Sequence, residues 1–180
     1  MSIVIWIGRL PHQRWPWLTM AAVALALELI ALYFQHGLKL DPCELCIYER
    51  CAMLGLMLAG LVGAIAPTSL LLRLGAFGLW LASSVWGLWL SWGHLMLQLN
   101  PPLIPTCASS PEFPAWLPLN QWLPWMFEAY GVCEESSWAL AGLSMVQWLV
   151  VVFSISLLVA ATVIGCQLLC WLNRGRPVAS

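Results

Sequence analysis

Four long apolar stretches constrain this chain more than any other feature of its sequence. They cover residues 17–34, 47–66, 71–90 and 147–169, and a helix needs about 20 residues to cross the hydrocarbon core of a bilayer. Charged residues make up only 8% of the 180 residues, whereas about 25% is usual in soluble domains. Such a chain cannot cover a soluble fold with polar surface. The sequence therefore predicts an all-α integral membrane protein, a bundle of four transmembrane helices that forms one domain over residues 1–180.

Basic residues are distributed unevenly between the two sides that four spans would create. Both termini and the short 67–70 connection share one side, and the other side carries Lys39, Arg50 and most of the acidic residues. Because Lys and Arg are enriched in cytoplasmic segments, we expect both termini in the cytoplasm and outer loops at 35–46 and 91–146. Five of the seven basic residues lie on the expected cytoplasmic side: Arg9, Arg14, Arg73, Arg174 and Arg176.

The seven cysteines follow this topology. Cys43 and Cys46 lie in the first outer loop, and Cys107 and Cys133 lie in the second. Disulfides form and persist on the oxidising outer side of a membrane. Two structural disulfides would therefore explain the four outer cysteines, and for Cys107 and Cys133 this interpretation stays open. The other three cysteines lie within or at the ends of apolar spans: Cys51, Cys166 and Cys170.

The spacing of Cys43 and Cys46 is hard to explain by a structural disulfide. A bridge that closes so short a loop removes little entropy from the unfolded chain, whereas CxxC pairs are typical of redox sites and metal sites. A zinc site would need a second closely spaced pair, which Cys107 and Cys133 do not supply. We therefore expect a redox-active pair and no metal, with a mixed site that uses His94 or another outer histidine as the weaker alternative.

The residues around this pair predict the start of a helix. Asp41 is expected as the N-cap, Pro42 at the first helical position, and Glu44 as the partner that completes a capping box. Cys43 and Cys46 would then lie in the first turn of the second span. There, free backbone N–H groups and the helix dipole stabilise a thiolate.

Arg50 lies one turn after Cys46 on the same helix face. It can stabilise the Cys46 thiolate or bind an electron acceptor at the membrane surface; the alternative is an interfacial arginine that reaches lipid phosphate or pairs with Glu49. The sequence contains no haem-attachment, dinucleotide-binding or iron–sulfur motif, so a membrane quinone is the remaining electron carrier. His94, expected at the outer end of the third span, is a candidate second donor to a quinone carbonyl.

Several segments resemble, in order, the bacterial disulfide bond formation protein B (DsbB) family. They are ALALELIALYFQH, PCELCIYERCA, HLMLQLNP, FPAWLPLNQWLP and the pattern PEFP…GVC…W. Paired cysteines in both outer loops, combined with Y-E-R after the CxxC, make the resemblance specific. It runs from about residue 16 to about residue 155.

The resemblance implies a monomeric thiol–disulfide oxidoreductase of the bacterial inner membrane that reoxidises a periplasmic DsbA-like dithiol oxidase. A thiolate of that partner would attack Cys107 and form a mixed disulfide. Cys133 would then engage Cys43 and release Cys46 as a thiolate beside the quinone. Electrons would pass to ubiquinone, with menaquinone as the alternative, and Arg50 matches the family's quinone-site arginine. Membrane lipid is expected around the bundle, and no nucleic-acid partner is expected.

Other residues depart from the family pattern or lie outside it. Glu44 stands between the two cysteines, where its carboxylate opposes a nearby thiolate. Cys51 is expected to pack on another helix face than Cys46, and Cys166 and Cys170 are expected to act as small apolar side chains. Glu28, in the middle of the first span, is either a protonated hydrogen-bond donor between helices or part of a proton relay.

The aromatic segment EFPAWLPLNQWLPWMF in the second loop is expected to lie in the membrane interface and to hold that loop close to the CxxC. An ordinary aromatic belt is the alternative. Two other functions also fit the chain. One is a paralogue with the same chemistry and a dedicated partner. The other is a membrane scaffold or assembly factor with two structural disulfides, which leaves Arg50 beside the CxxC unexplained.

Overall fold

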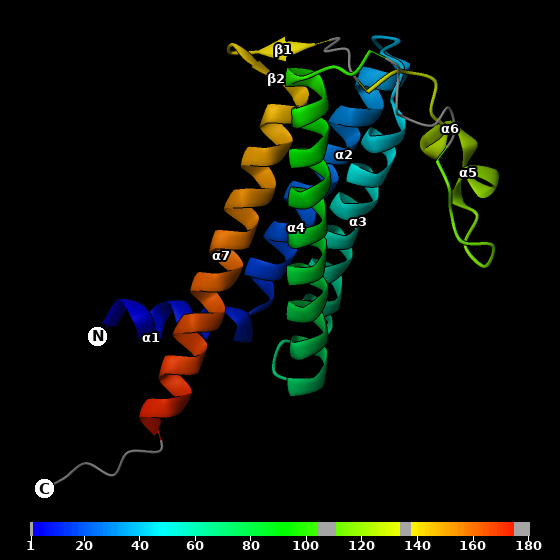
Figure 1. Ribbon diagram of the computed structural model, residues 1–180. Helices are drawn as coiled ribbons and strands as arrows, with labels where there is room; N and C mark the ends of the chain where they lie inside the picture. The colour runs from blue at the N-terminus through cyan, green and yellow to red at the C-terminus, as the bar shows by residue number, and fades with distance from the viewer. Residues whose placement is uncertain (1, 104–110, 134–137, 175–180) are drawn as a thin grey trace, which may run out of the picture.

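Four long helices form the body of the molecule in the computed structural model (Figure 1). All four are long and apolar enough to cross a membrane, which confirms the prediction of an all-α, multi-pass membrane protein. The helices are α2 (Arg14–His36), α3 (Glu44–Ile65), α4 (Leu70–Leu99) and α7 (Met145–Arg174). The structure describes residues 2–103, 111–133 and 138–174.

Three of these helices begin and end within a few residues of the expected spans, but α4 does not. It continues to Leu99 instead of ending near residue 90, so the second loop begins at residue 100 and not at 91. Nothing before Pro101 breaks the helix, and the polar side chains of its last turns are hydrogen-bonded to other parts of the fold. As a consequence, His94 lies inside a helix and not at its outer end.

Helix α3 packs between α2 and α4, and α7 packs on α4. The Trp17 ring of α2 stacks edge-on against Phe77 and Trp80 of α4, with ring centroids 5.2 Å and 5.9 Å away. A Cβ atom at Gly60 of α3 would lie only 2.7 Å from the Trp17 carbonyl oxygen, so the missing side chain allows α2 and α3 to approach. In contrast, α2 and α7 have little direct contact, and two apolar cavities lie between them.

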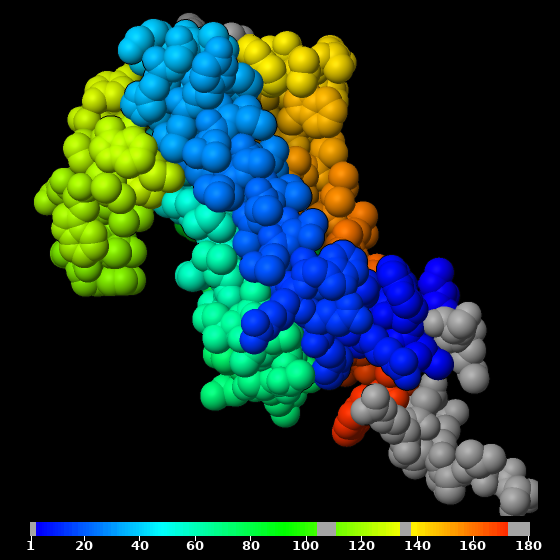
Figure 2. All heavy atoms as spheres, turned by 180° about the vertical axis from the view of Figure 1, so that it is seen from behind, coloured from blue at the N-terminus to red at the C-terminus, as the bar shows by residue number. Residues whose placement is uncertain are grey.

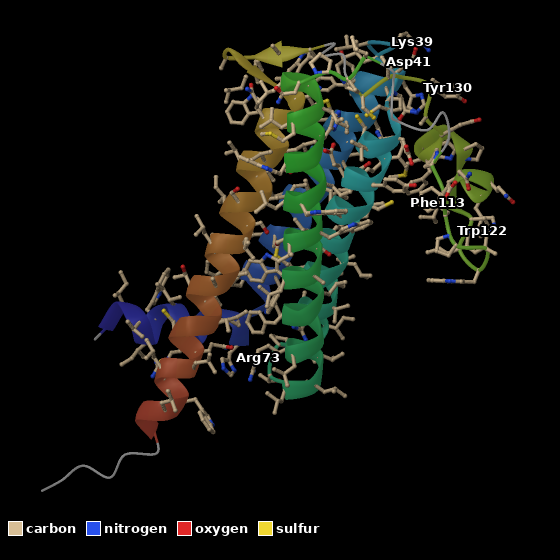
Figure 3. All side chains as sticks on the ribbon, viewed as in Figure 1. Lys39, Asp41, Arg73, Phe113, Trp122 and Tyr130 are labelled. Carbon is tan, nitrogen blue, oxygen red and sulfur yellow. The ribbon has the colours of Figure 1, made fainter. Side chains whose placement is uncertain are left out.

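A short helix, α1 (Ser2–Arg9), and a 3₁₀ turn, η1 (Leu10–His12), precede the bundle. Helix α1 crosses α7 near the end of the bundle where Arg73 lies (Figures 1 and 3). The Cys170 thiol donates to the Val4 carbonyl oxygen across this crossing, at 3.8 Å, and Cys166 is buried nearby. Both are free thiols, which confirms that they pack as small side chains.

The second loop forms two short helices and a hairpin. Helices α5 (Leu119–Trp122) and α6 (Pro124–Phe127) form a lobe on the flank of the bundle beside α3 (Figures 1 and 2). Strands β1 (Ala139–Leu140) and β2 (Leu143–Ser144) pair antiparallel just before α7. The two residues between the strands have φ values of 52° and 81°, as a tight hairpin turn requires. This hairpin was not predicted from the sequence.

The aromatic segment of the second loop is anchored on α3 by its last residues. Met126 and Phe127 are buried against Ile47 of α3, which confirms that the segment holds the loop close to the CxxC. The indoles of Trp116, Trp122 and Trp125 are 77%, 60% and 53% exposed, and Figure 3 shows Trp122 on the outside of the lobe. Its position in the membrane interface stays a prediction.

Candidate redox site

The CxxC pair lies where α3 begins, but the cap differs from the one expected. Cys43 is the N-cap, and its sulfur accepts a hydrogen bond from the Cys46 N–H at 3.3 Å. The prediction of Asp41 as N-cap and Pro42 as first helical residue is wrong. The reason is that the Pro42 carbonyl oxygen, which in a helix capped at Asp41 would accept the Cys46 N–H, instead accepts the N–H groups of Tyr130 and Gly131.

The two sulfurs of the pair lie 2.7 Å apart, and both residues are free thiols. This separation is shorter than non-bonded sulfur packing and longer than the about 2.05 Å of a disulfide. Cys43 is buried and Cys46 is half-buried. The two thiols are therefore placed to form a bond with each other after little movement.

The second loop brings a third cysteine to the same point. The N–H groups of Tyr130 and Gly131 bond to Pro42 at 2.9 Å and 3.0 Å, and a Cβ atom on Gly131 would collide with the Asp41 carbonyl oxygen. Two residues later, Cys133 is fully buried and disulfide-bonded. Its sulfur, the Cys43 sulfur and a ring nitrogen of His94 all lie within 4.8 Å of one another.

The structure thus brings Cys43, Cys46 and Cys133 together. Cys107, the other cysteine expected in the second loop, lies outside the described residues. Cys51 lies on a different face of α3 from the CxxC pair and packs beside Ile47 and Phe127, as predicted.

His94 reaches the cysteines from α4. Its Nε2 lies 3.7 Å from the Cys43 sulfur, and its Nδ1 lies 3.0 Å from Oε1 of Glu49. Both side chains are only 1% exposed. The expected place of His94 at the outer end of a span is therefore wrong, because the extended α4 carries it beyond that point to Cys43. Its role as a second donor to a quinone carbonyl stays a prediction.

Arg50 is held on the other side of α3. Its Nε lies 2.8 Å from Oε1 of Glu28, and its Nη1 donates to Oε1 of Gln35 at 2.9 Å and to the Met126 carbonyl oxygen. Arg50 is 7% exposed, so the alternatives of lipid contact and of a pair with Glu49 are wrong. Glu28 is the partner of Arg50, and the opposite charges offset part of each other's desolvation cost.

Four consecutive residues of α3 face four different parts of the molecule, because successive helical residues point about 100° apart. Ile47 packs under α6, and Tyr48 accepts the Glu112 N–H at 2.8 Å. Glu49 faces α4 and Arg50 faces α2. No role was predicted for Tyr48, and Glu49 was predicted only as a possible partner of Arg50. An acidic residue more than one turn inside an apolar helix was the available signal for Glu49.

Two cavities meet at this point. One has a volume of about 400 Å³, is lined mainly by apolar side chains of α2, α3 and α7, and has Cys46, Arg50 and Gln35 among its polar groups. The other has a volume of about 370 Å³ and includes Cys43 and His94. Cys46 and Glu49 line both cavities, whereas Cys43 and His94 line only the second. Figure 3 shows three further residues of the second cavity at the same end of the bundle: Lys39, Asp41 and Tyr130.

Comparison with known proteins identifies the family. The model of the family described as disulfide bond formation protein DsbB matches residues 13–163. A disulfide bond formation protein B from Psychromonas ingrahamii is 54% identical over 79% of this chain and 77% of its own length. Proteins of the same name from Salmonella typhimurium and Pectobacterium atrosepticum are 51% and 48% identical, each over 89% of this chain and 91% of their own length. The chain therefore belongs to the DsbB family.

Proposed function

We propose that this chain is a quinone-dependent thiol oxidase of the bacterial inner membrane that reoxidises a periplasmic DsbA-like dithiol oxidase. Membership in a family named for disulfide bond formation supports the thiol–disulfide chemistry. The observation that carries the proposal is the place of Cys46. It lies beside Cys43, which neighbours Cys133, and it also lines the apolar cavity between α2, α3 and α7.

The order of the thiol–disulfide exchange steps follows from the positions of the cysteine sulfurs relative to one another. The partner's thiolate attacks Cys107, and the Cys133 thiolate that leaves then attacks Cys43. Attack at Cys43 breaks the Cys43–Cys46 bond, and the electron pair leaves on the Cys46 sulfur. At the third position of α3, this thiolate is stabilised by the N-terminal end of the helix. Each exchange moves one electron pair from sulfur to sulfur, so the partner's two electrons arrive at Cys46.

The apolar cavity fits a lipid-soluble quinone. A mostly apolar lining with a few convergent polar groups is typical of cofactor sites. The polar groups here are Arg50 and Gln35 beside the thiol of Cys46, together with the carboxyl groups of Glu28, Asp41 and Glu49. Arg50 is fixed by Glu28 and by the Met126 carbonyl oxygen, so it can orient a bound carbonyl group without moving. The quinone would accept two electrons and two protons; we propose ubiquinone, with menaquinone as the alternative.

A route from the bilayer to this cavity runs between α2 and α7. A further apolar cavity of about 620 Å³ lies along the same two helices and shares Leu27, Met53 and Val152 with the first. Since α2 and α7 have little direct contact, a quinone with a long apolar tail can enter from the lipid. This arrangement supports a carrier that diffuses in the membrane.

We also propose that the redox site faces the periplasm and that both termini lie in the cytoplasm. The support is the distribution of charge. Arg73 lies at the end of the bundle opposite to Lys39 and Asp41 (Figure 3), and Arg9 and Arg14 flank the turn η1, whose His12 contacts Arg73.

The test is quinone reduction by the purified protein in detergent, with a reduced DsbA-like oxidase as electron donor and quinone absorbance as readout. We expect catalytic loss of quinone absorbance that Cys46→Ser abolishes. Cys51→Ser, which removes a free thiol from another face of the same helix, is the matched control and should retain turnover. Absence of both turnover and quinone binding would contradict the proposal and favour a scaffold with structural disulfides.

A further inference from the structure

His94 lies between a carboxylate and a thiol, and this geometry determines which of its ring nitrogens donates a hydrogen bond and which accepts one. Nδ1 is 3.0 Å from Oε1 of Glu49, and Nε2 is 3.7 Å from the sulfur of Cys43. A carboxylate accepts hydrogen bonds, so the ring carries its proton on Nδ1 and donates it to Glu49. In a neutral ring the other nitrogen, Nε2, is then a hydrogen-bond acceptor. It therefore presents its lone pair to the Cys43 thiol.

The hydrogen bonding of the buried Glu49 side chain is incomplete among the described residues. Glu49 is 1% exposed, and its second oxygen, Oε2, has no hydrogen-bond partner among the described residues. A buried carboxylate oxygen without a partner is costly, so its presence calls for a compensating role. A positive charge that forms on His94, directly beside Glu49, supplies that compensation.

We propose that His94, held and oriented by Glu49, is the base that takes the proton of the Cys43 thiol and the acid that returns it. In the forward direction the S–H bond of Cys43 breaks and an N–H bond forms at Nε2 of His94. The electron pair stays on sulfur, so a thiolate and an imidazolium form from two neutral groups, and no external oxidant or reductant is needed. Glu49 is a positioning residue that acts through His94.

The proposal deepens the exchange reaction proposed above and rests on it for the moment at which the step is used. Cys43 becomes free after Cys133 has broken its bond to Cys46 and after its bond to Cys133 has been broken in turn. The partner's second thiol releases Cys107 from the mixed disulfide, the Cys107 thiolate attacks Cys133, and the electron pair leaves on Cys43, which His94 can protonate. To form the Cys43–Cys46 disulfide again, Cys43 must react as a thiolate. A base 3.7 Å from its sulfur supplies that thiolate at a side chain that is itself buried.

The other groups that face His94 leave Glu49 as its charged partner. From α3, the sulfur of Cys46 lies near the ring. From the second loop, the sulfur of Cys133 lies near it as well, and the backbone of Cys133 is hydrogen-bonded to the ring. Lys39, Asp41 and Tyr130 line the same cavity, and α7 contributes the apolar side chains of Met145, Val146 and Leu149. Among the described residues, Glu49 is the charged group within hydrogen-bond distance of His94.

The first test uses the native protein and needs no variant to fold. Nitrogen-15 NMR of the histidine-labelled, fully reduced, quinone-free protein in detergent reports which ring nitrogen of His94 carries the proton, and His94→Gln assigns the signal. The expected result is a ring protonated on Nδ1, neutral or as imidazolium. A neutral ring protonated on Nε2 would overturn the proposal, because such a ring has no lone pair to offer Cys43.

The second test measures the reactivity of Cys43 directly. In the full chain with Cys46, Cys107 and Cys133 replaced by Ser, the rate of Cys43 modification by a small thiosulfonate is followed against pH by mass spectrometry. We expect Glu49→Gln to move the rate profile to higher pH and to lower the rate at pH 7 by about tenfold, as one logarithmic unit of thiolate population implies. Glu49→Asp should restore part of the rate.

The matched control is Glu128→Gln, which removes an exposed carboxylate of the second loop and should leave the profile unchanged. If Glu49→Gln and His94→Gln both leave the pH profile of Cys43 unchanged while the protein stays folded, the pair is only structural and the proposal is wrong. Since no quinone and no partner are present, this outcome is independent of whether the chain is a quinone-dependent oxidase.

Discussion

The two ends of the bundle bury different chemistry, although the same helices build both. Toward the end that holds Arg73, the core consists of aromatic and small residues, such as Trp17 against Phe77 and Gly60. Toward the other end, α2, α3 and α4 bury two pairs of an acidic and a basic side chain. These pairs are Glu28 with Arg50 and Glu49 with His94. Only the second end contains the cysteines of the redox site.

Along α3, the end near Arg73 therefore contributes mainly to stability, whereas the other end carries the chemistry. Apolar packing at the first end depends on shape, and a change there removes contacts without leaving a charge unpaired. At the second end each ionisable group depends on its partner, because removal of one member leaves the other buried and uncompensated. Changes at the two ends should therefore have different consequences for function.

Trp17→Ala should have the largest effect on stability and none on the chemistry of the folded molecules. The indole is 3% exposed and donates a hydrogen bond to the Pro11 carbonyl oxygen, and truncation of a buried Trp to Ala costs about 3 to 5 kcal/mol. Thermal unfolding in detergent measures the loss. Quinone reduction per folded molecule, measured below the unfolding transition, should equal that of the native chain. A lower value would show that packing at this end of the bundle also affects the chemistry at the other end.

Arg50→Met should lower both stability and quinone reduction. It leaves Glu28 buried without its ion-pair partner, which we expect to cost about 3 kcal/mol, and it removes the guanidinium from the apolar cavity. The double variant Glu28→Gln with Arg50→Met should recover stability but not quinone reduction. Recovery of both would show that Arg50 serves the fold alone.

Gly131→Ala should slow the exchange between the loop and the CxxC pair. The new methyl group would collide with the Asp41 carbonyl oxygen, and overpacking of this kind costs about 2 kcal/mol. The second loop must then move away from Pro42, and Cys133 with it. Stopped-flow measurement of electron transfer from a reduced DsbA-like partner checks the rate. Gly142→Ala, at the hairpin turn, is a control for general disturbance of the loop.

Tyr48→Phe should have the smallest effect. It removes the hydroxyl that accepts the Glu112 N–H and donates to Glu44, at a half-buried place where a hydrogen bond contributes about 1 kcal/mol. The ring contact with Phe113, at 6.1 Å between centroids, is retained. Proteolysis of the second loop should become faster while the unfolding temperature changes little. A large fall in that temperature would mean that this loop stabilises the whole bundle.

Local patterns were sufficient to predict the helices and to select the CxxC pair. Span length, charge content and cysteine spacing are properties of short stretches, and they predicted the four apolar helices. The packing of Cys51, Cys166 and Cys170 also followed from their places in apolar spans.

Contacts between distant segments were not predictable in the same way. The pair of Glu49 with His94 depends on how far α4 extends and how it turns against α3. The cap at Cys43 depends on a bond between Pro42 and a loop almost ninety residues away, as its partners Tyr130 and Gly131 show. Glu28 and Arg50 were each singled out from the sequence, but nothing local to either residue indicated that they are partners.

The most direct test of the proposed electron path is whether Cys133 can bond to Cys43. In a chain with Cys46→Ala and Cys107→Ala, these two cysteines are left without their expected partners, and we expect mild oxidation to link them in one disulfide. Peptide mapping by mass spectrometry without reduction detects the link, and Gly131→Ala in the same background should reduce its yield. If Cys43 and Cys133 stay unlinked while the protein remains folded, the two cysteine pairs do not exchange at the start of α3, and the proposed electron path is wrong.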